Sequence, residues 1–276
     1  MKIRYSAAFA VLAFASASQA QILHGVMFRT GGQTSGLNPK LYDVNPATGA
    51  ATNPRNVNVN SLVGVAVNSQ GKMYGLTDQF GRINNVSGSG GKGLLVTIDR
   101  VTGKANAVGR VDPSSSAGDA PLAIYEGDIA FHPTTGVLYG ITTRVNYTTL
   151  FTIDTATGLG TLVSNVFPSS GIDLDASAMA FSQTGDLWLL DTRYPANPGP
   201  AKLYKVDAAS GSVLQTLTTA TTLGTCAGMA FMPNGDLLVT DGDTGGTNNL
   251  YKVNFASSSL ELIGATGAAG GNYAGL

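Results

Sequence analysis

The chain has 276 residues, only 12% of them charged, and its 16 Lys and Arg against 17 Asp and Glu give a net charge of −1. This balance argues against nucleic acid as a partner, because surfaces that bind phosphate backbones need a dense basic stripe. Cys226 is the single cysteine, which excludes an intrachain disulfide and leaves the stability of the fold to packing.

Residues 1–20 have the pattern of a signal peptide. Lys2 and Arg4 form a positive start, residues 7–17 are a short apolar run, and residues 18–20 suit a cleavage site. The apolar run is shorter than the roughly 20 residues that span a bilayer. We therefore expect cleavage near Ala20 and a secreted or periplasmic protein without a membrane span, whose residues 21–276 form a single domain.

Residues 22–28 have the pattern of a β-strand, and a nine-residue phrase follows that returns along the whole chain. Its five copies begin at Leu41, Leu95, Leu150, Leu203 and Leu250, so they are spaced 54, 55, 53 and 47 residues apart. Self-similarity with a period of about 20–50 residues is typical of a repeat protein.

One repeat reads as four strands. In the most regular copy these are residues 227–231, 236–240, 250–254 and 260–264, with the turn Pro233-Asn234-Gly235 between the first two. Short strands with Gly-rich turns indicate an all-β fold. Four strands per repeat favour the β-propeller, whose blade is a four-stranded sheet.

The two ends of the chain complement each other. Residues 22–28 match a second strand with no first strand before it, and residues 271–276 match the beginning of a first strand. Pairing the two would complete one blade and remove two free sheet edges. We therefore predict a five-bladed β-propeller of four-stranded antiparallel blades, closed by pairing the C-terminal strand with the N-terminal blade.

The repeated phrases resemble those of a known group of proteins. Gly-Met-Ala-Phe-x-Pro-Asn-Gly-Asp-Leu at 228–237 and Leu-Tyr-Lys-Val-Asp-x-x-Ser-Gly at 203–211 are similar to units of secreted bacterial β-propellers. These include NHL-type and quinoprotein-dehydrogenase-like propellers and families of unknown function. The resemblance implies that the first strand of each blade is innermost. It also implies that ligand sites lie at the mouth where first strands begin and second strands end, here called the upper mouth. Such propellers host lyases, hydrolases, redox enzymes and binding modules, so the resemblance implies no single activity.

Most acidic residues have a structural explanation. Asp99, Asp154 and Asp207 each end a third strand and precede a turn closed by Gly. An Asp at this position accepts hydrogen bonds from turn amides. His132, which precedes Pro133, is expected to be a turn residue as well.

At the expected upper mouth, one acidic cluster stands out. It contains Glu126, Asp128, Asp173 and Asp175. Hard cations such as Ca²⁺ favour such oxygen clusters, although no copy shows an EF-hand-type loop. No other cofactor is expected.

A column of arginines at the same mouth contains Arg29, Arg144 and Arg193, with Tyr125 and Tyr273 nearby. Converging guanidinium groups would hold a carboxylate, phosphate or sulfate. The alternative is a solvated rim in which each Arg pairs with an acid such as Asp191 or Asp241.

The sequence contains no familiar catalytic motif, and His24 and His132, its two histidines, are not expected to form a ligand set. The first hypothesis is therefore an exported, monomeric, non-catalytic binding propeller that takes a small molecule, glycan or protein at the upper mouth. The alternative is a Ca²⁺-assisted lyase or hydrolase that uses the acidic cluster. A structural or matrix protein is the third possibility.

Overall fold

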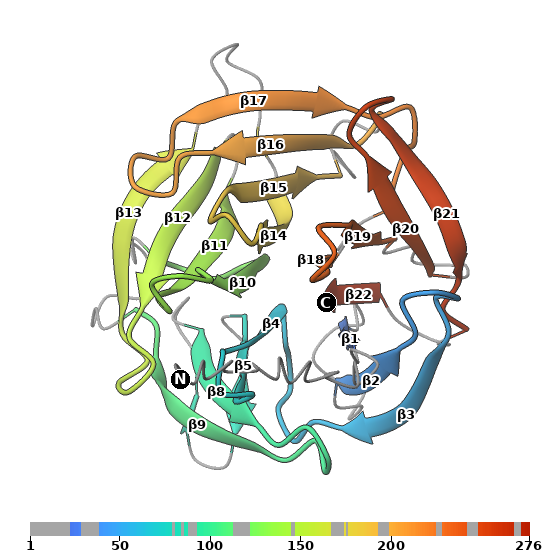
Figure 1. The fold of residues 1–276 in the computed structure, drawn as a ribbon. Helices are drawn as coiled ribbons and strands as arrows, with labels where there is room; N and C mark the ends of the chain where they lie inside the picture. Colours follow the sequence, from blue (N-terminus) through green and yellow to red (C-terminus); the bar gives the residue numbers. More distant parts are fainter. Residues whose placement is uncertain are drawn as a thin grey trace, which may run out of the picture.

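The computed structural model describes residues 23–28, 39–78, 81–83, 86–87, 93–112, 122–144, 147–166, 174, 176–192, 199–224, 228–241, 248–267 and 272–276. These residues form a ring of five four-stranded sheets, with one strand of each sheet nearest the centre (Figure 1). The predicted five-bladed β-propeller is thereby confirmed. The predicted signal peptide lies outside the described residues. No helix in the described ranges is long and apolar enough to cross a membrane.

Each blade is an antiparallel meander whose four strands follow one another from the centre of the ring outward. Blade 1 contains β22 (Asn272–Gly275), β1 (Leu23–Phe28), β2 (Lys40–Val44) and β3 (Ala51–Asn56). Blade 2 contains β4 (Gly64–Val67), β5 (Met73–Leu76), β8 (Leu94–Ile98) and β9 (Ala105–Arg110), with a ribbon of β6 (Arg82–Ile83) and β7 (Val86–Ser87) between β5 and β8. Blade 3 contains β10 (Gly127–Phe131), β11 (Leu138–Arg144), β12 (Tyr147–Ile153) and β13 (Gly160–Val166). Blade 4 contains β14 (Ala176–Phe181), β15 (Leu187–Asp191), β16 (Lys202–Val206) and β17 (Val213–Thr218). Blade 5 contains β18 (Met229–Phe231), β19 (Leu237–Thr240), β20 (Asn249–Asn254) and β21 (Ser259–Ala265).

The two ends of the chain share blade 1, as predicted. β22 pairs antiparallel with β1, so that Tyr273 lies opposite Met27 and Asn272 opposite Phe28. Without this pair, the inner edge of β1 would present unpaired backbone groups. The pairing therefore closes the ring through hydrogen bonds.

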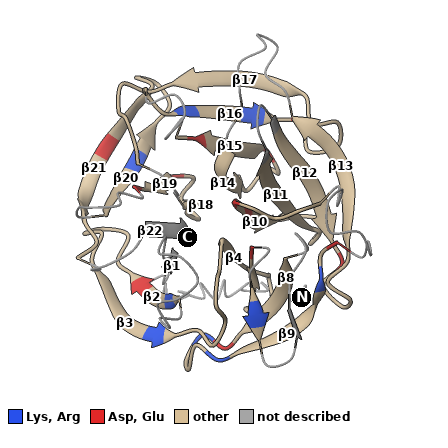
Figure 2. Cartoon of the chain, turned by 180° about the vertical axis from the view of Figure 1, so that it is seen from behind, with Lys and Arg blue, Asp and Glu red and all other residues tan. Residues whose placement is uncertain are grey.

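The apolar core lies between neighbouring blades. Leu190 and Leu203 of blade 4, for example, pack in one cluster with Leu237 and Val239 of blade 5. Because blades are covered on both faces, central strands such as β14 and β15 are buried along their whole length. Charged residues are few and scattered over the described ring, and in blade 1 an acid on β2 lies beside a base on β3 (Figure 2).

The turns after the third strands have the predicted structure. Asp99 Oδ1 accepts hydrogen bonds from the amides of Val101 and Thr102, at 2.9 and 2.8 Å. These bonds lower the pKa of the Asp99 carboxyl, and Gly103 closes the turn at a φ of 76°. The same contacts recur at Asp154 and Asp207. The structural explanation of these acids is confirmed.

Candidate functional site

The structure describes the side chains of only part of the predicted upper mouth. Arg144 lies in β11 and Tyr273 in β22, but their side chains are not described. Four further predicted residues lie outside the described ranges: Arg29, Asp173, Asp175 and Arg193. The predicted arginine column and acidic cluster therefore stay predictions.

Three predicted residues of the upper mouth are described, just before and within β10. Tyr125 is 48% exposed, and Glu126 is also exposed, although nearby protein atoms desolvate its carboxyl and raise its pKa. Asp128 is instead buried within the ring, with 1% of its surface exposed. Two of the three are thus accessible to a ligand, and Asp128 is not.

Asp128 has the contacts of a structural residue. Its Oδ1 accepts a hydrogen bond from the Ile129 amide at 2.8 Å, and its Oδ2 accepts one from the Met179 amide of β14 at 3.1 Å. A Cβ on Gly64 of β4 would collide with the Asp128 carboxylate, so only glycine leaves room there. Burial raises the pKa of Asp128 well above its ordinary value, and the two amide bonds oppose that shift. Asp128 therefore links the inner strands of blades 2, 3 and 4.

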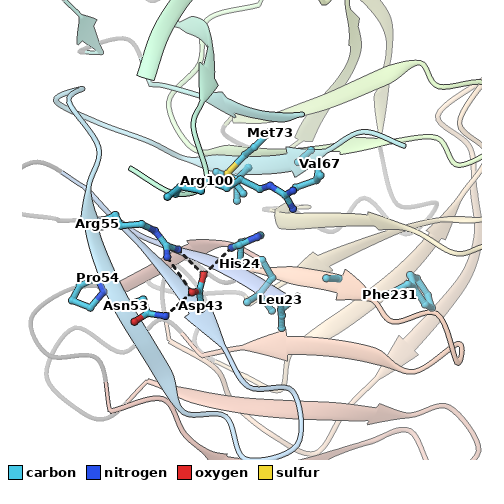
Figure 3. A pocket seen from close by; sticks show the side chains of 15 residues that line it. Leu23, His24, Asp43, Asn53, Pro54, Arg55, Val67, Met73, Arg100 and Phe231 are labelled. Carbon is cyan, nitrogen blue, oxygen red and sulfur yellow. Dashed lines mark hydrogen bonds and ion pairs between the residues drawn. The ribbon is translucent and has the colours of Figure 1, made fainter. Parts of the chain in front are cut away.

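The described residues line an open cavity of about 1220 Å³ at the opposite mouth. Leu23 and Met73 line it where the second strands β1 and β5 begin, and Val67 and Phe231 line it where the first strands β4 and β18 end (Figure 3). This end of the channel is here called the lower mouth, and the space is called the blade-1/blade-2 cavity. None of the predicted site residues is among the residues that line this cavity in the described ranges.

A network of polar side chains centres on Asp43, which faces this cavity from β2. Arg55 of β3 donates through Nη1 to Oδ2 at 3.0 Å and through Nη2 to Oδ1 at 2.6 Å. Asn53 Nδ2 also donates to Oδ2, at 2.9 Å. Arg55 and Asp43 are only 14% and 18% exposed. Chiefly because of the Arg55 hydrogen bonds, the pKa of Asp43 falls to about 2. Asp43 is therefore ionised and paired in two-pronged geometry.

An irregularity in β3 brings Asn53 to this position. The register of β2 and β3 shifts between Leu41 and Asp43, and the bulge on β3 contains Asn53 and Pro54. Asn53 has a φ of 51°, a left-handed conformation that is uncommon for any residue except glycine. A backbone held in this region costs of order 1–3 kcal/mol and is enriched at functional sites. Here the conformation accompanies the contact between the Asn53 amide and Asp43.

His24 of β1 lies on the other side of Asp43. Its Nδ1 is buried and lies 3.2 Å from Asp43 Oδ1, without a well-aligned hydrogen bond to any residue of the described ranges. Burial lowers the pKa of His24, helped by Arg100 and Arg55 and opposed by Asp43. His24 is therefore a neutral imidazole near pH 7 that lies beside a carboxylate.

Arg100 approaches the cavity from blade 2. It belongs to the turn between β8 and β9 and extends past Val67, across the cavity from the Asp43 network (Figure 3). Its Nη2 lies beside Gly71, since a Cβ there would be 3.3 Å away. Arg100 is exposed and forms no hydrogen bond or ion pair with the described residues. The described cavity wall thus has one guanidinium paired with a carboxylate and a second without such a partner.

The His24–Asp43 pair is peculiar to blade 1. In the register of the other blades, the same two positions are occupied by Tyr74 and Thr97, Tyr139 and Thr152, Trp188 and Lys205, and Leu238 and Lys252. The predicted site residues lie instead at the strand ends that face the upper mouth. A comparison of the five copies at the mid-strand positions would have singled out His24 and Asp43.

No family model matches the sequence, and no curated protein matches it. The resemblance to NHL-type and quinoprotein-dehydrogenase-like propellers therefore stays a prediction beyond the fold itself.

Among solved structures, the chain is similar to a protein of unknown function from Dyadobacter fermentans DSM 18053, with a TM-score of 0.52 at 10% identity, over 80% of this chain and 69% of that one. The endo-arabinase from Bacteroides thetaiotaomicron VPI-5482 has a TM-score of 0.50 at 13% identity, over 80% and 82%. A chain of the nidogen/laminin complex has a TM-score of 0.50 at 10% identity, over 92% and 97%. The chain spans 57% of Kuenenia stuttgartiensis hydrazine synthase and 53% of the Dos1 propeller, which it also matches. At these identities the likeness concerns the fold alone.

Proposed function

We propose that this protein is an exported, non-catalytic binding propeller that takes a small molecule into the blade-1/blade-2 cavity. The observation that carries the proposal is the polar network on one wall of that cavity. Ligand sites are commonly concave spaces of about 300–1,000 Å³ with apolar walls and a few well-placed polar groups. The blade-1/blade-2 cavity, at about 1220 Å³, has room for a small molecule and water.

The chemistry of the network favours binding over turnover. Arg55 and Asn53 hold the Asp43 carboxylate ionised and already hydrogen-bonded. Such a carboxylate is a poor general acid or base near neutral pH, where a catalytic group needs a pKa near the working pH. The same contacts fix the geometry of the wall before a ligand arrives, which reduces the cost of binding.

The test is a thermal-shift screen of small organic acids, sugars and amino acids. A ligand present at about 100 times its Kd stabilises the folded state by about 2.7 kcal/mol. For a domain of this size, that corresponds to a rise in Tm of about 5–10 °C. We expect hits with the natural sequence and none with Ala230→Trp, which fills the cavity from β18.

Leu214→Trp is the matched control, because Leu214 is an exposed residue of the outer strand β17. It should keep every hit. Equal Tm shifts in the Ala230→Trp protein would place binding elsewhere and contradict the proposal. Chemical conversion of a hit by the natural protein would contradict its non-catalytic part.

The upper mouth stays a proposed second surface for a glycan or protein partner. The alternative Ca²⁺-assisted lyase or hydrolase also stays a prediction there. Within the described ranges no three His, Cys, Asp or Glu side chains gather as a metal site. Asp173 and Asp175 lie outside those ranges. A Ca²⁺-dependent rise in Tm that EDTA reverses would support the alternative, and no response to divalent ions would contradict it.

A further inference from the structure

We propose that the blade-1/blade-2 cavity is a proton-linked site for an organic anion. The acid group of the ligand lies between Arg100 and His24, and its hydrocarbon or aromatic body lies against the apolar wall. This inference rests on the proposed function, since it assigns a ligand class to the same cavity.

The two arginines on the described cavity wall differ in their pairing. Arg55 is matched by Asp43 through two short hydrogen bonds. Arg100 has no such partner among the described residues, so its guanidinium is available to a ligand. A guanidinium recognises a carboxylate, sulfonate or phosphate through paired N–H donors. An anionic group on the ligand would therefore complement Arg100.

Arg100 is the one charged residue that the five copies have at its position. Each third strand ends in a similar turn, and the position of Arg100 is held by Pro46, Thr155, Ala208 and Phe255 in the other copies. His24, Asp43 and Arg100 all face one cavity, although they come from two blades. Residues that occur in only one copy and converge in space indicate a local role.

His24 is the group whose protonation would be coupled to binding of the anion. The charged groups around it are Asp43 on β2, Arg55 on β3 and Arg100 in the β8–β9 turn. β22, which pairs with β1, contributes no charged side chain. Burial, helped by the two arginines and opposed by Asp43, lowers the pKa of His24 and keeps it neutral. A bound anion would offset the arginines and favour the imidazolium, so binding should take up a proton and strengthen as the pH falls.

The apolar residues on the rest of the cavity wall indicate the chemistry of the non-acidic part of the ligand. Val65, Val67 and Met73 of blade 2, Phe231 of blade 5 and Leu23 of blade 1 line the cavity. Burying apolar area against such side chains contributes roughly 25 cal/mol per Å². An anion with an apolar body would use both parts of the wall, whereas a free inorganic anion would use only the arginine side.

Isothermal titration calorimetry with 1-octanesulfonate tests the inference, because this probe stays ionised across the pH range used. 1-Octanol carries the same body without the charge, and methanesulfonate carries the charge without the body. We expect the natural protein to bind 1-octanesulfonate more tightly than either. Arg100→Gln should weaken binding about 10- to 100-fold, the value of a charge-assisted hydrogen bond. Arg82→Gln, an exposed arginine outside the cavity, should not.

The pH dependence of 1-octanesulfonate binding tests the role of His24. From about pH 7.5 to about pH 5.5, binding of 1-octanesulfonate should tighten about three- to tenfold, since one unit of pKa change equals a factor of ten. His24→Gln should abolish this dependence, and His132→Gln should retain it. His24→Tyr is the second variant if His24→Gln fails to fold, because blades 2 and 3 carry Tyr at this position.

The outcomes separate the two proposals. If 1-octanol binds as tightly as 1-octanesulfonate, or the pH dependence survives in both His24 variants, the anion inference is wrong and the cavity remains a binding site. If 1-octanesulfonate does not bind while other screened molecules do, the anion inference is also overturned. If neither the screen nor the probes bind the natural protein, the proposed function fails as well.

Discussion

Asp43 organises the polar wall of the cavity because side chains from two neighbouring strands converge on it. Arg55 and Asn53 of β3 hydrogen-bond to the carboxylate, and His24 of β1 approaches it at 3.2 Å. In blades 4 and 5, Lys occupies the position of Asp43 and pairs with Asp186 or Asp236 on the same blade. Blade 1 therefore carries the opposite charge at this position, and the base that pairs with it, Arg55, lies on the outer strand β3.

Removal of Arg55 should show how much the Arg55–Asp43 pair contributes to the free energy of unfolding. We expect Arg55→Met to lower the free energy of unfolding by about 2 kcal/mol near neutral pH, because Asp43 loses its main partner. The folded-state pKa of Asp43, about 2, lies below its ordinary value of 3.8. The contribution is therefore present above about pH 4 and is lost as the pH falls toward 2.

Urea unfolding of both proteins across acidic and neutral pH measures this effect. The difference between them should shrink as the pH falls below about 4. Lys205→Met is the control, since its ion pair with Asp186 is more exposed and should contribute at most about 1 kcal/mol. A difference that grows on acidification would refute the assignment.

At the scale of elements, the inner strands of blades 2, 3 and 4 meet closely around Asp128. β4 and β10 approach so closely that Gly64 leaves no space for a Cβ beside Asp128, and Asp128 also accepts a hydrogen bond from β14. Each outer strand contains a register shift against the third strand, and the inner strands β22 and β14 contain one against the second strand. The Asn53–Pro54 bulge is one of the outer-strand shifts.

The loss of stability on replacement of Asp128 should depend on pH. We expect Asp128→Ala to lower the free energy of unfolding by about 2–4 kcal/mol at mildly acidic pH, because two hydrogen bonds are lost at a buried position. The pKa of Asp128 is raised in the folded state. Its contribution is therefore complete below the unfolded-state pKa and declines as the pH rises through the folded-state pKa.

Urea unfolding at intervals from about pH 4 to about pH 8 follows this difference. The gap between the natural protein and Asp128→Ala should narrow as the pH rises. Ser177→Ala, at a buried hydroxyl of β14, controls for the loss of a polar group without a titrating proton. A gap that widens with pH would show that Asp128 is ionised and stabilising.

At the scale of the whole molecule, the ring could be predicted from sequence because each blade repeats the same local chemistry. The Asp99 turn and its copies mark the ends of third strands, and the complementary chain ends indicated the shared blade. The cavity could not be predicted in that way. His24, Asp43 and Arg100 are far apart in sequence, and only the register of β1 with β2 and the approach of blade 2 bring them to one space.

The central claim is that the ligand occupies the blade-1/blade-2 cavity, and a crystal structure of the protein with 1-octanesulfonate tests it most directly. We predict sulfonate density between Arg100 and His24, with the alkyl chain along Val65, Met73 and Phe231. The Asp43–Arg55 pair should remain in place. Density at the upper mouth, beside Tyr125, with an empty cavity would contradict this claim.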